Sequence, residues 1–259
     1  MLYIHIPFCV YKCAYCNFYS VVNMNSPNLY KKYLDALIKE FEIRIKDYKK
    51  NIETIYIGGG TPSIIGEKML EYFFEKLFEV INKNNNEEIK EITIEFNIND
   101  INKDSLKVIS QIKNIRLSIG IQTFNEESLK IINRKTDKND IIEALKLINK
   151  SNIENISVDF ICGLPLNDKE QSKKDILQAF DLLPKIKHIS LYYLELNDSL
   201  KNKWRDFLPT EEDCVYYYNL AKETIESFGL MRYEISNYAF SNYESIHNSG
   251  YWDLKDYTL

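Results

Sequence analysis

The sequence predicts an α/β protein with a parallel sheet, and three observations support this prediction. Short apolar runs of the kind found in buried strands alternate six times with segments of helical periodicity. Such alternation indicates parallel strands joined by helical crossovers. Glycines or polar residues follow the strands, at the edge where parallel folds bind ligands. Since a complete barrel has about eight units, six units indicate an incomplete barrel or an open doubly wound sheet.

The expected elements follow from local patterns in chain order. Ser26-Pro27 is typical of an N-cap and first helical position, and apolar residues continue at helical spacing from Tyr30 to Ile45. The expected strands are 2–6, 52–57, 92–96, 115–119, 156–161 and 188–194, with 232–236 as a further candidate. The other expected helices are 67–82, 103–112, 126–132, 138–150, 169–183 and 211–228.

Composition narrows the class of protein. The 259 residues are 45% hydrophobic and 27% charged, as expected for a soluble globular chain. A net charge of −5 argues against nucleic acid as the main partner, which usually requires a basic face. We expect no membrane span and no signal peptide, because no apolar run is long enough and a strand follows Met1 directly. Five cysteines without a paired framework indicate a cytoplasmic location.

Three of the five cysteines, Cys9, Cys13 and Cys16, form a C-x3-C-x2-C loop after the first strand. Three thiolates on one loop suit an iron–sulfur cluster, and a four-iron cluster would keep one iron open for another ligand. A zinc site that uses His5 as its fourth ligand is an alternative, although no second C-x2-C pair is present. A disulfide is a second alternative, but Cys13 and Cys16 are too close to constrain much chain.

Other candidate residues follow later strands. Gly58-Gly59-Gly60-Thr61 after the second strand lets backbone approach a ligand, although it could equally be a flexible turn. Glu95 and Asp159 lie on apolar strands, where a charge is costly unless it is paired, so each is either a ligand-binding group or half of a salt bridge. Gln122 and Arg134, taken singly, could be surface residues.

The cysteine loop, with an aromatic residue before its third cysteine, resembles the radical S-adenosylmethionine (SAM) superfamily. The frame Tyr3-Ile-His-Ile-Pro-Phe-Cys9 is similar to the oxygen-independent coproporphyrinogen III oxidases and their HemW-type heme chaperone relatives. Arg116-Leu-Ser-Ile-Gly-Ile-Gln-Thr-Phe124 and Val158-Asp-Phe-Ile-Cys-Gly-Leu-Pro165 are similar to two further motifs of this group. The resemblance implies an incomplete (β/α)6 TIM-like barrel and a [4Fe–4S] cluster on the three loop cysteines. It also implies SAM binding by Tyr3, Tyr15, Gly59, Gly60, Thr61, Glu95, Gln122, Arg134, Asp159 and Leu194.

Two segments depart from the family pattern. Ile132-Asn-Arg-Lys135 has asparagine where chaperone-branch members usually have glycine, and the arginine is kept. Glu95-Phe-Asn-Ile-Asn lacks the proline that often follows the first asparagine.

Two features favour the chaperone branch over the oxidase branch. Phe18 stands where the oxidases have a fourth cysteine, and the chain begins directly at the first strand. The segment from His247 to Trp252 is similar to an HNxxYW motif, which implies heme binding by His247, Asn248, Tyr251 and Trp252. Without the resemblance, His247 could be an ordinary surface residue, whereas His5 and His188 lie on strands and are expected to be core histidines.

The resemblance therefore implies a radical SAM core at 1–228 and the start of a truncated heme-binding region at 229–259. The expected function is that of a heme chaperone, with [4Fe–4S], SAM and heme as cofactors. Its expected partners are an unidentified heme acceptor and an electron donor. The alternative is decarboxylation of coproporphyrinogen III to protoporphyrinogen IX. No catalytic residue is assigned.

Overall fold

The structure is a computed structural model that describes residues 1–22, 26–48, 50–84 and 87–255. The chain forms two compact units. Unit 1 comprises Met1–Val10, Phe18–Leu117 and Ser245–Leu259, and unit 2 comprises Tyr11–Asn17 and Ser118–Glu244.

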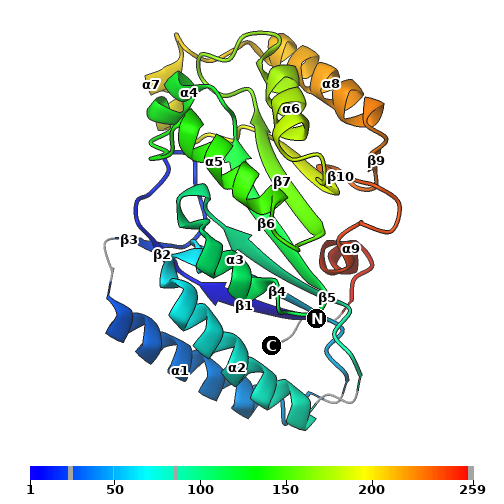
Figure 1. Cartoon of the computed structure of the whole chain (residues 1–259). Coiled ribbons are helices and arrows are strands. Elements are labelled where there is room, and N and C mark those ends of the chain that lie inside the picture. Colours follow the sequence, from blue (N-terminus) through cyan, green and yellow to red (C-terminus); the bar gives the residue numbers. More distant parts are fainter. Residues whose placement is uncertain (23–25, 49, 85–86, 256–259) are drawn as a thin grey trace. The chain divides into compact units, whose positions relative to one another are not determined.

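Unit 1 is built on parallel strands whose apolar side chains pack against helices. β1 pairs with β4 and β4 pairs with β5, all in parallel, while β2 and β3 form a separate short parallel pair. α1 and α2 lie side by side, and α3 packs beside α2 (Figure 1). Ile6, Leu34, Ile55, Leu70 and Phe73 are fully buried in this unit. Its elements are β1 (Leu2–Ile6), β2 (Phe8–Cys9), β3 (Val21–Val22), α1 (Pro27–Arg44), β4 (Thr54–Gly59), α2 (Glu67–Asn84), β5 (Glu91–Phe96), α3 (Lys103–Ile109), α9 (Ile246–Trp252) and the 3₁₀ helices η1 (Pro62–Ile65) and η2 (Ile98–Asp100).

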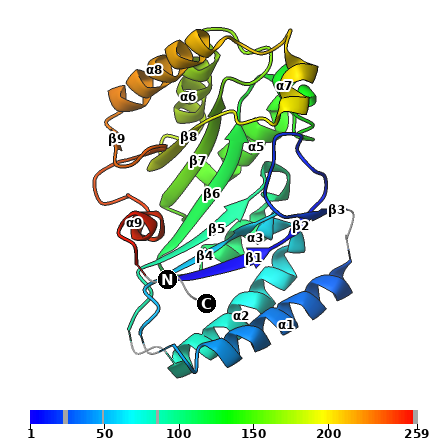
Figure 2. The same ribbon diagram turned by 180° about the vertical axis from the view of Figure 1, so that it is seen from behind.

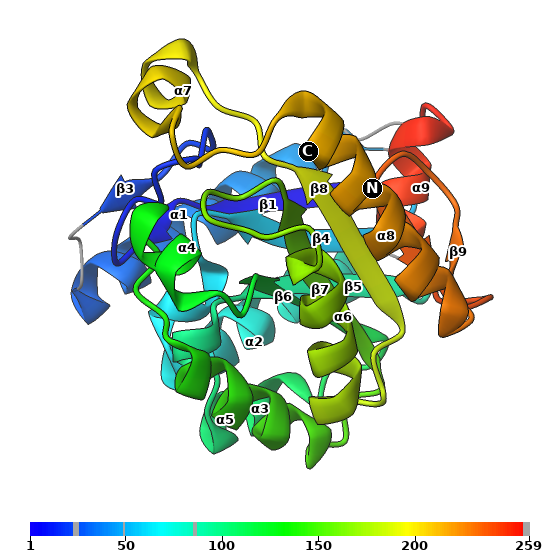
Figure 3. The same cartoon turned by 90° about the horizontal axis from the view of Figure 1, so that it is seen from above.

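Unit 2 continues the alternation of strands and helices and ends in an antiparallel segment. β7 and β8 pair in parallel, whereas β10 pairs antiparallel with both β8 and β9. α6 packs against α5 and α8, and α8 lies beside β8 (Figure 3). Its elements are α4 (Glu126–Ile131), α5 (Lys138–Asn149), β7 (Asn155–Cys162), α6 (Gln171–Leu182), β8 (His188–Tyr193), α7 (Asp198–Trp204), α8 (Glu211–Ser227), β9 (Met231–Arg232) and β10 (Asn237–Ala239). β6 (Ile115–Gln122) begins in unit 1 and ends in unit 2.

The predicted α/β class with parallel strands is confirmed, and every expected strand up to 188–194 is present within a few residues of its predicted bounds. The candidate strand at 232–236 is wrong in detail. Residues 234–236 form a bend, and the short antiparallel strands β9 and β10 lie on either side of residues 233–236. α7 and α9 lie where no helix was predicted, since each is only 7 residues long and shows little periodicity.

The predicted domain boundary at residue 228 stays a prediction. Residues 229–244 belong to unit 2, the following residues belong to unit 1, and 256–259 lie outside the described residues. In the part of the chain that the structure describes, no helix is long and apolar enough to cross a membrane.

Candidate functional site

The strands of unit 1 carry a row of polar side chains at alternate positions. The register pairs Tyr3 with Tyr56 and Thr54 with Glu91, and side chains two residues apart on a strand share one face. The rings of Tyr3 and Tyr56 stack with centroids 6.0 Å apart, and the Tyr56 hydroxyl donates a 2.6 Å hydrogen bond to Glu95. Burial, followed by the nearby Glu95 carboxylate, raises the pKa of Tyr3. Two predicted SAM residues, Tyr3 and Glu95, therefore belong to one connected polar face.

The glycine run at the end of β4 holds the segment that leads into Cys9. The Gly60 amide donates to the Ile6 carbonyl at 2.9 Å, and a Cβ at Gly60 would lie 2.7 Å from the backbone of Pro7 and Phe8. The Sγ of Cys9 lies 3.5 Å from the Thr61 hydroxyl. The missing side chain of Gly60 thus allows the protein's own backbone before Cys9, and not only a ligand, to approach the end of β4 closely.

Gly59 lies where both the backbone conformation and the neighbouring His5 ring require a residue without a side chain. Its φ of 118° is a conformation that L side chains rarely adopt, and a Cβ there would lie 2.7 Å from the His5 ring. His5 is half-buried, with Nδ1 3.2 Å from the Tyr3 hydroxyl and Nε2 3.1 Å from the Tyr19 carbonyl. His5 therefore makes hydrogen bonds within unit 1, as predicted, but it is half-buried and so lies at the edge of the core.

In unit 2, residues 132–134 hold the remainder of the cysteine loop. The Ala14 amide donates to the Ile132 carbonyl at 2.9 Å, and the Asn133 side chain donates to the Lys12 carbonyl at 2.8 Å. Asn133 has a φ of 56°, in the left-handed region where glycine and asparagine are favoured. Asparagine can therefore replace the glycine of related sequences and contribute a further hydrogen bond.

Arg134 lies beside the same loop. One terminal guanidinium nitrogen donates to the Gly120 carbonyl, and the Nε atom is buried without a hydrogen-bond partner in the described structure. Burial raises the pKa of Tyr15 well above its usual range, although the adjacent Arg134 charge lowers it. A buried guanidinium N–H without a partner is costly, and an anionic ligand would satisfy it.

The remaining predicted SAM residues also belong to unit 2. Gln122 ends β6 with a φ of 73° and is buried. Asp159 accepts a 3.3 Å hydrogen bond from Ser118, and Leu194 follows β8, where its amide donates to the Cys162 carbonyl at 2.9 Å. These three residues lie at or after the strands on which they were predicted.

The three cysteines of the predicted cluster are divided between the units, with Cys9 in unit 1 and Cys13 and Cys16 in unit 2. None of these three described cysteines forms a disulfide, and all three are half-buried. Within neither unit, as far as the structure describes it, do three His, Cys, Asp or Glu side chains gather into a metal site. The donor set still fits an iron–sulfur cluster, because thiolates are the ligands such clusters require and these thiols are accessible.

The predicted heme segment forms α9, which is anchored in unit 1 by a buried carboxylate. Glu91 at the start of β5 is 3% exposed and accepts hydrogen bonds from the Ser245 hydroxyl and from the amides of Ile246 and His247, at 2.9–3.1 Å. Ser245 caps the helix by accepting from the Asn248 amide. Figure 2 shows α9 beside the start of β4.

His247 is fully buried, and both of its ring nitrogens have partners. Nδ1 lies 2.9 Å from the Thr54 hydroxyl, and Nε2 lies 3.2 Å from the Tyr251 hydroxyl. Its ring packs 5.3 Å from the ring of Tyr56. Burial lowers the pKa of His247 to about 4, so the imidazole is neutral near pH 7, as an iron ligand must be. Tyr251 and Trp252 are exposed, at 39% and 54%.

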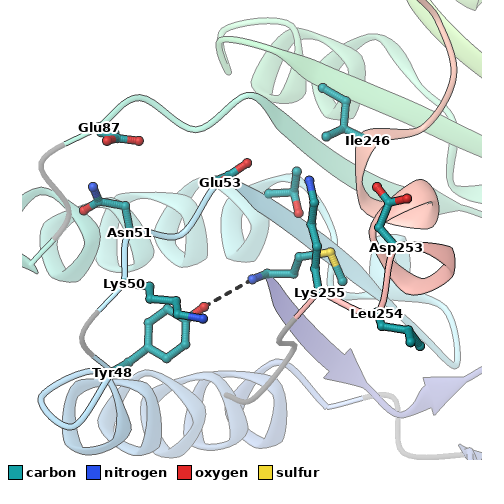
Figure 4. Close-up of a pocket in the computed structure, with 11 residues that line it drawn as sticks. Tyr48, Lys50, Asn51, Glu53, Glu87, Ile246, Asp253, Leu254 and Lys255 are labelled. Atoms are coloured by element: carbon teal, nitrogen blue, oxygen red, sulfur yellow. Dashed lines mark hydrogen bonds between the residues drawn. The ribbon is translucent and has the colours of Figure 1, made fainter.

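A hollow of about 770 Å³ lies next to α9 in unit 1 (Figure 4). Charged side chains from several segments line it, among them Lys50, Glu53, Asp253 and Lys255, and the chain's amino group donates to the Tyr48 hydroxyl at 3.5 Å. Neither Tyr251 nor Trp252 contributes to the lining. The lining is thus mostly polar and charged, and its apolar members are Met1, Ile246 and Leu254.

Comparisons with known proteins show the family of the chain. The model of the radical SAM superfamily matches residues 3–176. Over 261 residues the chain is 37% identical to the heme chaperone HemW of Buchnera aphidicola subsp. Schizaphis graminum, covering 99% of this chain and 67% of that protein. Over 260 residues it is 34% identical to HemW of Lactococcus lactis subsp. lactis, covering 98% and 66%. The chain thus spans about two thirds of the length of these relatives.

Among solved structures, coproporphyrinogen III oxidase (HemN) from Escherichia coli, a radical SAM enzyme, matches with a TM-score of 0.78 at 23% identity. That match covers 93% of this chain and 55% of the oxidase, and it shows a shared fold. The predicted fold class is therefore confirmed, and the chain is a radical SAM protein. Within that superfamily it belongs to the HemW family.

Sequence reasoning missed the residues that position the site, above all Thr54, Glu91 and the side chain of Asn133. A signal for the first two was present. Thr54, Tyr56 and Gly58 on one strand, and Glu91, Thr93 and Glu95 on the next, alternate with apolar residues. The sequence of a fully buried parallel strand is usually a continuous apolar run. This alternation therefore indicates that one face of these strands is polar and contacts a ligand or other polar groups of the protein.

Proposed function

We propose that this protein is a heme chaperone, which binds heme on α9 and passes it to an acceptor protein. The observation that carries the proposal is the similarity of nearly the whole chain to HemW heme chaperones. The predicted heme residues are consistent with it, since α9 exposes two aromatic faces beside a buried neutral imidazole. We also propose a cytoplasmic location and an electron-donor partner, as the sequence predicts.

The proposed cluster ligands are the thiolates of Cys9, Cys13 and Cys16. The close approach of Gly60 to Pro7 and the contact of Asn133 with Lys12 support this assignment, because they fix the backbone before Cys9 and directly before Cys13. When bound, the cluster supplies one-electron chemistry and an iron position open to SAM. The chain's own part is to hold three sulfurs on one loop, beside the buried ring of Phe8.

The proposed SAM residues are those that the family resemblance assigned. Their arrangement supports the assignment in two places. Tyr3, Tyr56 and Glu95 present connected polar groups on unit 1, and the buried Nε of Arg134 in unit 2 has an N–H to offer to an anionic group. The full set is Tyr3, Tyr15, Gly59, Gly60, Thr61, Glu95, Gln122, Arg134, Asp159 and Leu194.

Anaerobic reconstitution with iron and sulfide tests the cluster. We expect about four irons per chain, and a large loss of iron in Cys13→Ala. Full retention of iron in that variant would refute the assignment.

Titration with hemin tests the heme proposal. We expect a Soret band that shifts and weakens in His247→Ala, with iron–sulfur content unchanged because His247 is remote in the chain from the cysteines. A wild-type heme spectrum and affinity in this variant would place heme elsewhere.

The fold shared with an oxidase makes coproporphyrinogen III oxidation the competing function. Anaerobic incubation with coproporphyrinogen III, SAM and a reductant separates the two proposals. We expect no protoporphyrinogen, and its formation would overturn the chaperone proposal.

A further inference from the structure

The surroundings of His247 differ sharply between its two ring nitrogens. Nδ1 faces Thr54, which lies within β4 and is 1% exposed. Nε2 faces the hydroxyl of Tyr251, which lies one helical turn further along α9 and is 39% exposed. One partner is thus fixed in the sheet, whereas the other is carried by a side chain at the surface.

The chemistry of the partners determines which nitrogen carries the proton. A phenol is a better hydrogen-bond donor than an aliphatic hydroxyl, so Tyr251 donates to Nε2. A ring nitrogen that accepts a hydrogen bond carries no proton, so the proton lies on Nδ1, which donates to Thr54 Oγ1. This tautomer leaves the lone pair of Nε2 in the plane of the ring, directed at the Tyr251 hydroxyl.

We propose that Thr54 is a positioning residue for a heme-ligating His247, and that Tyr251 shields Nε2 until heme arrives. The inference rests on the proposed function, and it assigns roles to two contacts within unit 1. Metal-ligating histidines generally donate their second ring N–H to a fixed oxygen, which sets the tautomer and the ring orientation. Thr54 Oγ1 supplies that oxygen, and Glu91 fixes the backbone of the same residue through the His247 amide.

Iron can reach Nε2 only after the Tyr251 hydroxyl leaves it. The Tyr251 side chain can rotate toward solvent without breaking the Glu91 and Thr54 contacts, because it takes part in neither. Trp252, which is 54% exposed, remains as an aromatic face for the macrocycle. The inferred change for ligation is therefore a movement of the Tyr251 side chain that keeps the Glu91 and Thr54 contacts of α9.

Stopped-flow hemin binding to the whole chain tests both roles. Tyr251→Phe keeps the ring but removes the hydroxyl, so we expect heme to bind roughly 2–10-fold faster, the gain from losing one competing hydrogen bond. Thr54→Val keeps the side-chain volume but removes the oxygen, so we expect affinity to fall about 10–100-fold with a changed ligand-field spectrum. The matched controls are Tyr216→Phe, on the exposed face of α8, and Thr224→Val, a buried threonine of α8. Both controls should match the wild type. Heme binding through His247 that is unaffected in both test variants would overturn the inference and leave the proposed function standing.

A measurement without heme tests the shielding by Tyr251 separately from the proposed heme-chaperone function. Diethyl pyrocarbonate modifies accessible neutral imidazoles, and peptide mass spectrometry locates the modified histidine. We expect His247 to be protected in the wild type and modified in Tyr251→Ala. This result together with no heme binding would support the shielding and refute the proposed function. Equal modification in both proteins would overturn the shielding.

Discussion

Asn133 shows how one side chain can satisfy a backbone requirement and a contact at once. Its φ of 56° is unfavourable for most residues, and its side-chain amide donates to the Lys12 carbonyl next to Cys13. The sequence showed only that asparagine replaced the usual glycine. The structure shows that the substitution keeps the left-handed turn and adds a hydrogen bond to the cysteine loop.

A buried carboxylate supports the turn after Gln122. Asp175 on α6 is 2% exposed and accepts hydrogen bonds from the Phe124 amide at 3.0 Å and from Gln171 at 2.7 Å. Burial raises the pKa of Asp175 to about 6. An unfolded aspartate titrates near about 3.9, so between these values the native state binds more protons than the unfolded state. This carboxyl therefore stabilises the fold most at low pH, and its contribution is lost as pH rises through about 6.

We accordingly expect Asp175→Asn to flatten the pH dependence of the unfolding free energy between about pH 4 and 6, by up to about 3 kcal/mol. Urea unfolding at a series of pH values measures this. Asp181→Asn, an exposed position on the same helix, is the control and should keep the wild-type slope. The same slope in Asp175→Asn would show that the buried carboxyl is not the titrating group.

At the scale of elements, β4 joins the two proposed ligand sites of unit 1. Its first residue, Thr54, binds His247, and its third, Tyr56, contacts both the His247 ring and Glu95. Its last residue, Gly59, packs against His5, and Gly60 follows against the backbone before Cys9. One strand thus contacts the heme segment at its start and the cysteine loop at its end.

Gly60→Ala tests the second of these contacts. The added methyl group would lie 2.7 Å from backbone atoms of Pro7 and Phe8, which cannot give way as a flexible side chain would. We expect a loss of about 1–3 kcal/mol of stability and a lower iron content after reconstitution. Gly66→Ala is the control, because Gly66 has a φ of 78° but no atom within 4 Å of an added Cβ.

The control should lose about 1–3 kcal/mol through backbone strain, because φ 78° with ψ 167° is a conformation that essentially only glycine adopts, and it should still bind iron as the wild type does. Equal iron content in the two variants would mean that the glycine run does not position the cysteine loop.

For the whole molecule, the sequence predicted the strands and helices whose patterns depend on residues close together in the chain. Strands such as 92–96 and helices such as 67–82 were found from apolar periodicity, which is local. The docking of α9 was not predictable in this way, since Ser245 and Glu91 are 154 residues apart. The reversal at β10 was missed because β9 and β10 have only 2 and 3 residues, too few to show a period. The site residues themselves came from motif resemblance, whereas the residues that hold them emerged only from contacts.

The five cysteines of the chain should divide into a reactive set of three and a set that takes no part in iron binding. Cys162 is fully buried, its sulfur accepts from Ser172 at 3.7 Å, and burial raises the pKa of its thiol to about 11. Burial also raises the pKa of the half-buried Cys214. Because the thiolate is the reactive form, both should alkylate slowly near pH 8.

We therefore expect iodoacetamide to label Cys9, Cys13 and Cys16 of the iron-free native protein quickly, and Cys162 only after unfolding. Reconstitution before labelling should protect the three loop cysteines, because their sulfurs would then be bound to iron. Cys162→Ala and Cys214→Ala should each keep the wild-type iron content. A loss of iron in Cys214→Ala would instead identify Cys214 as a fourth thiolate ligand. Four thiolate ligands would leave no iron position open for SAM.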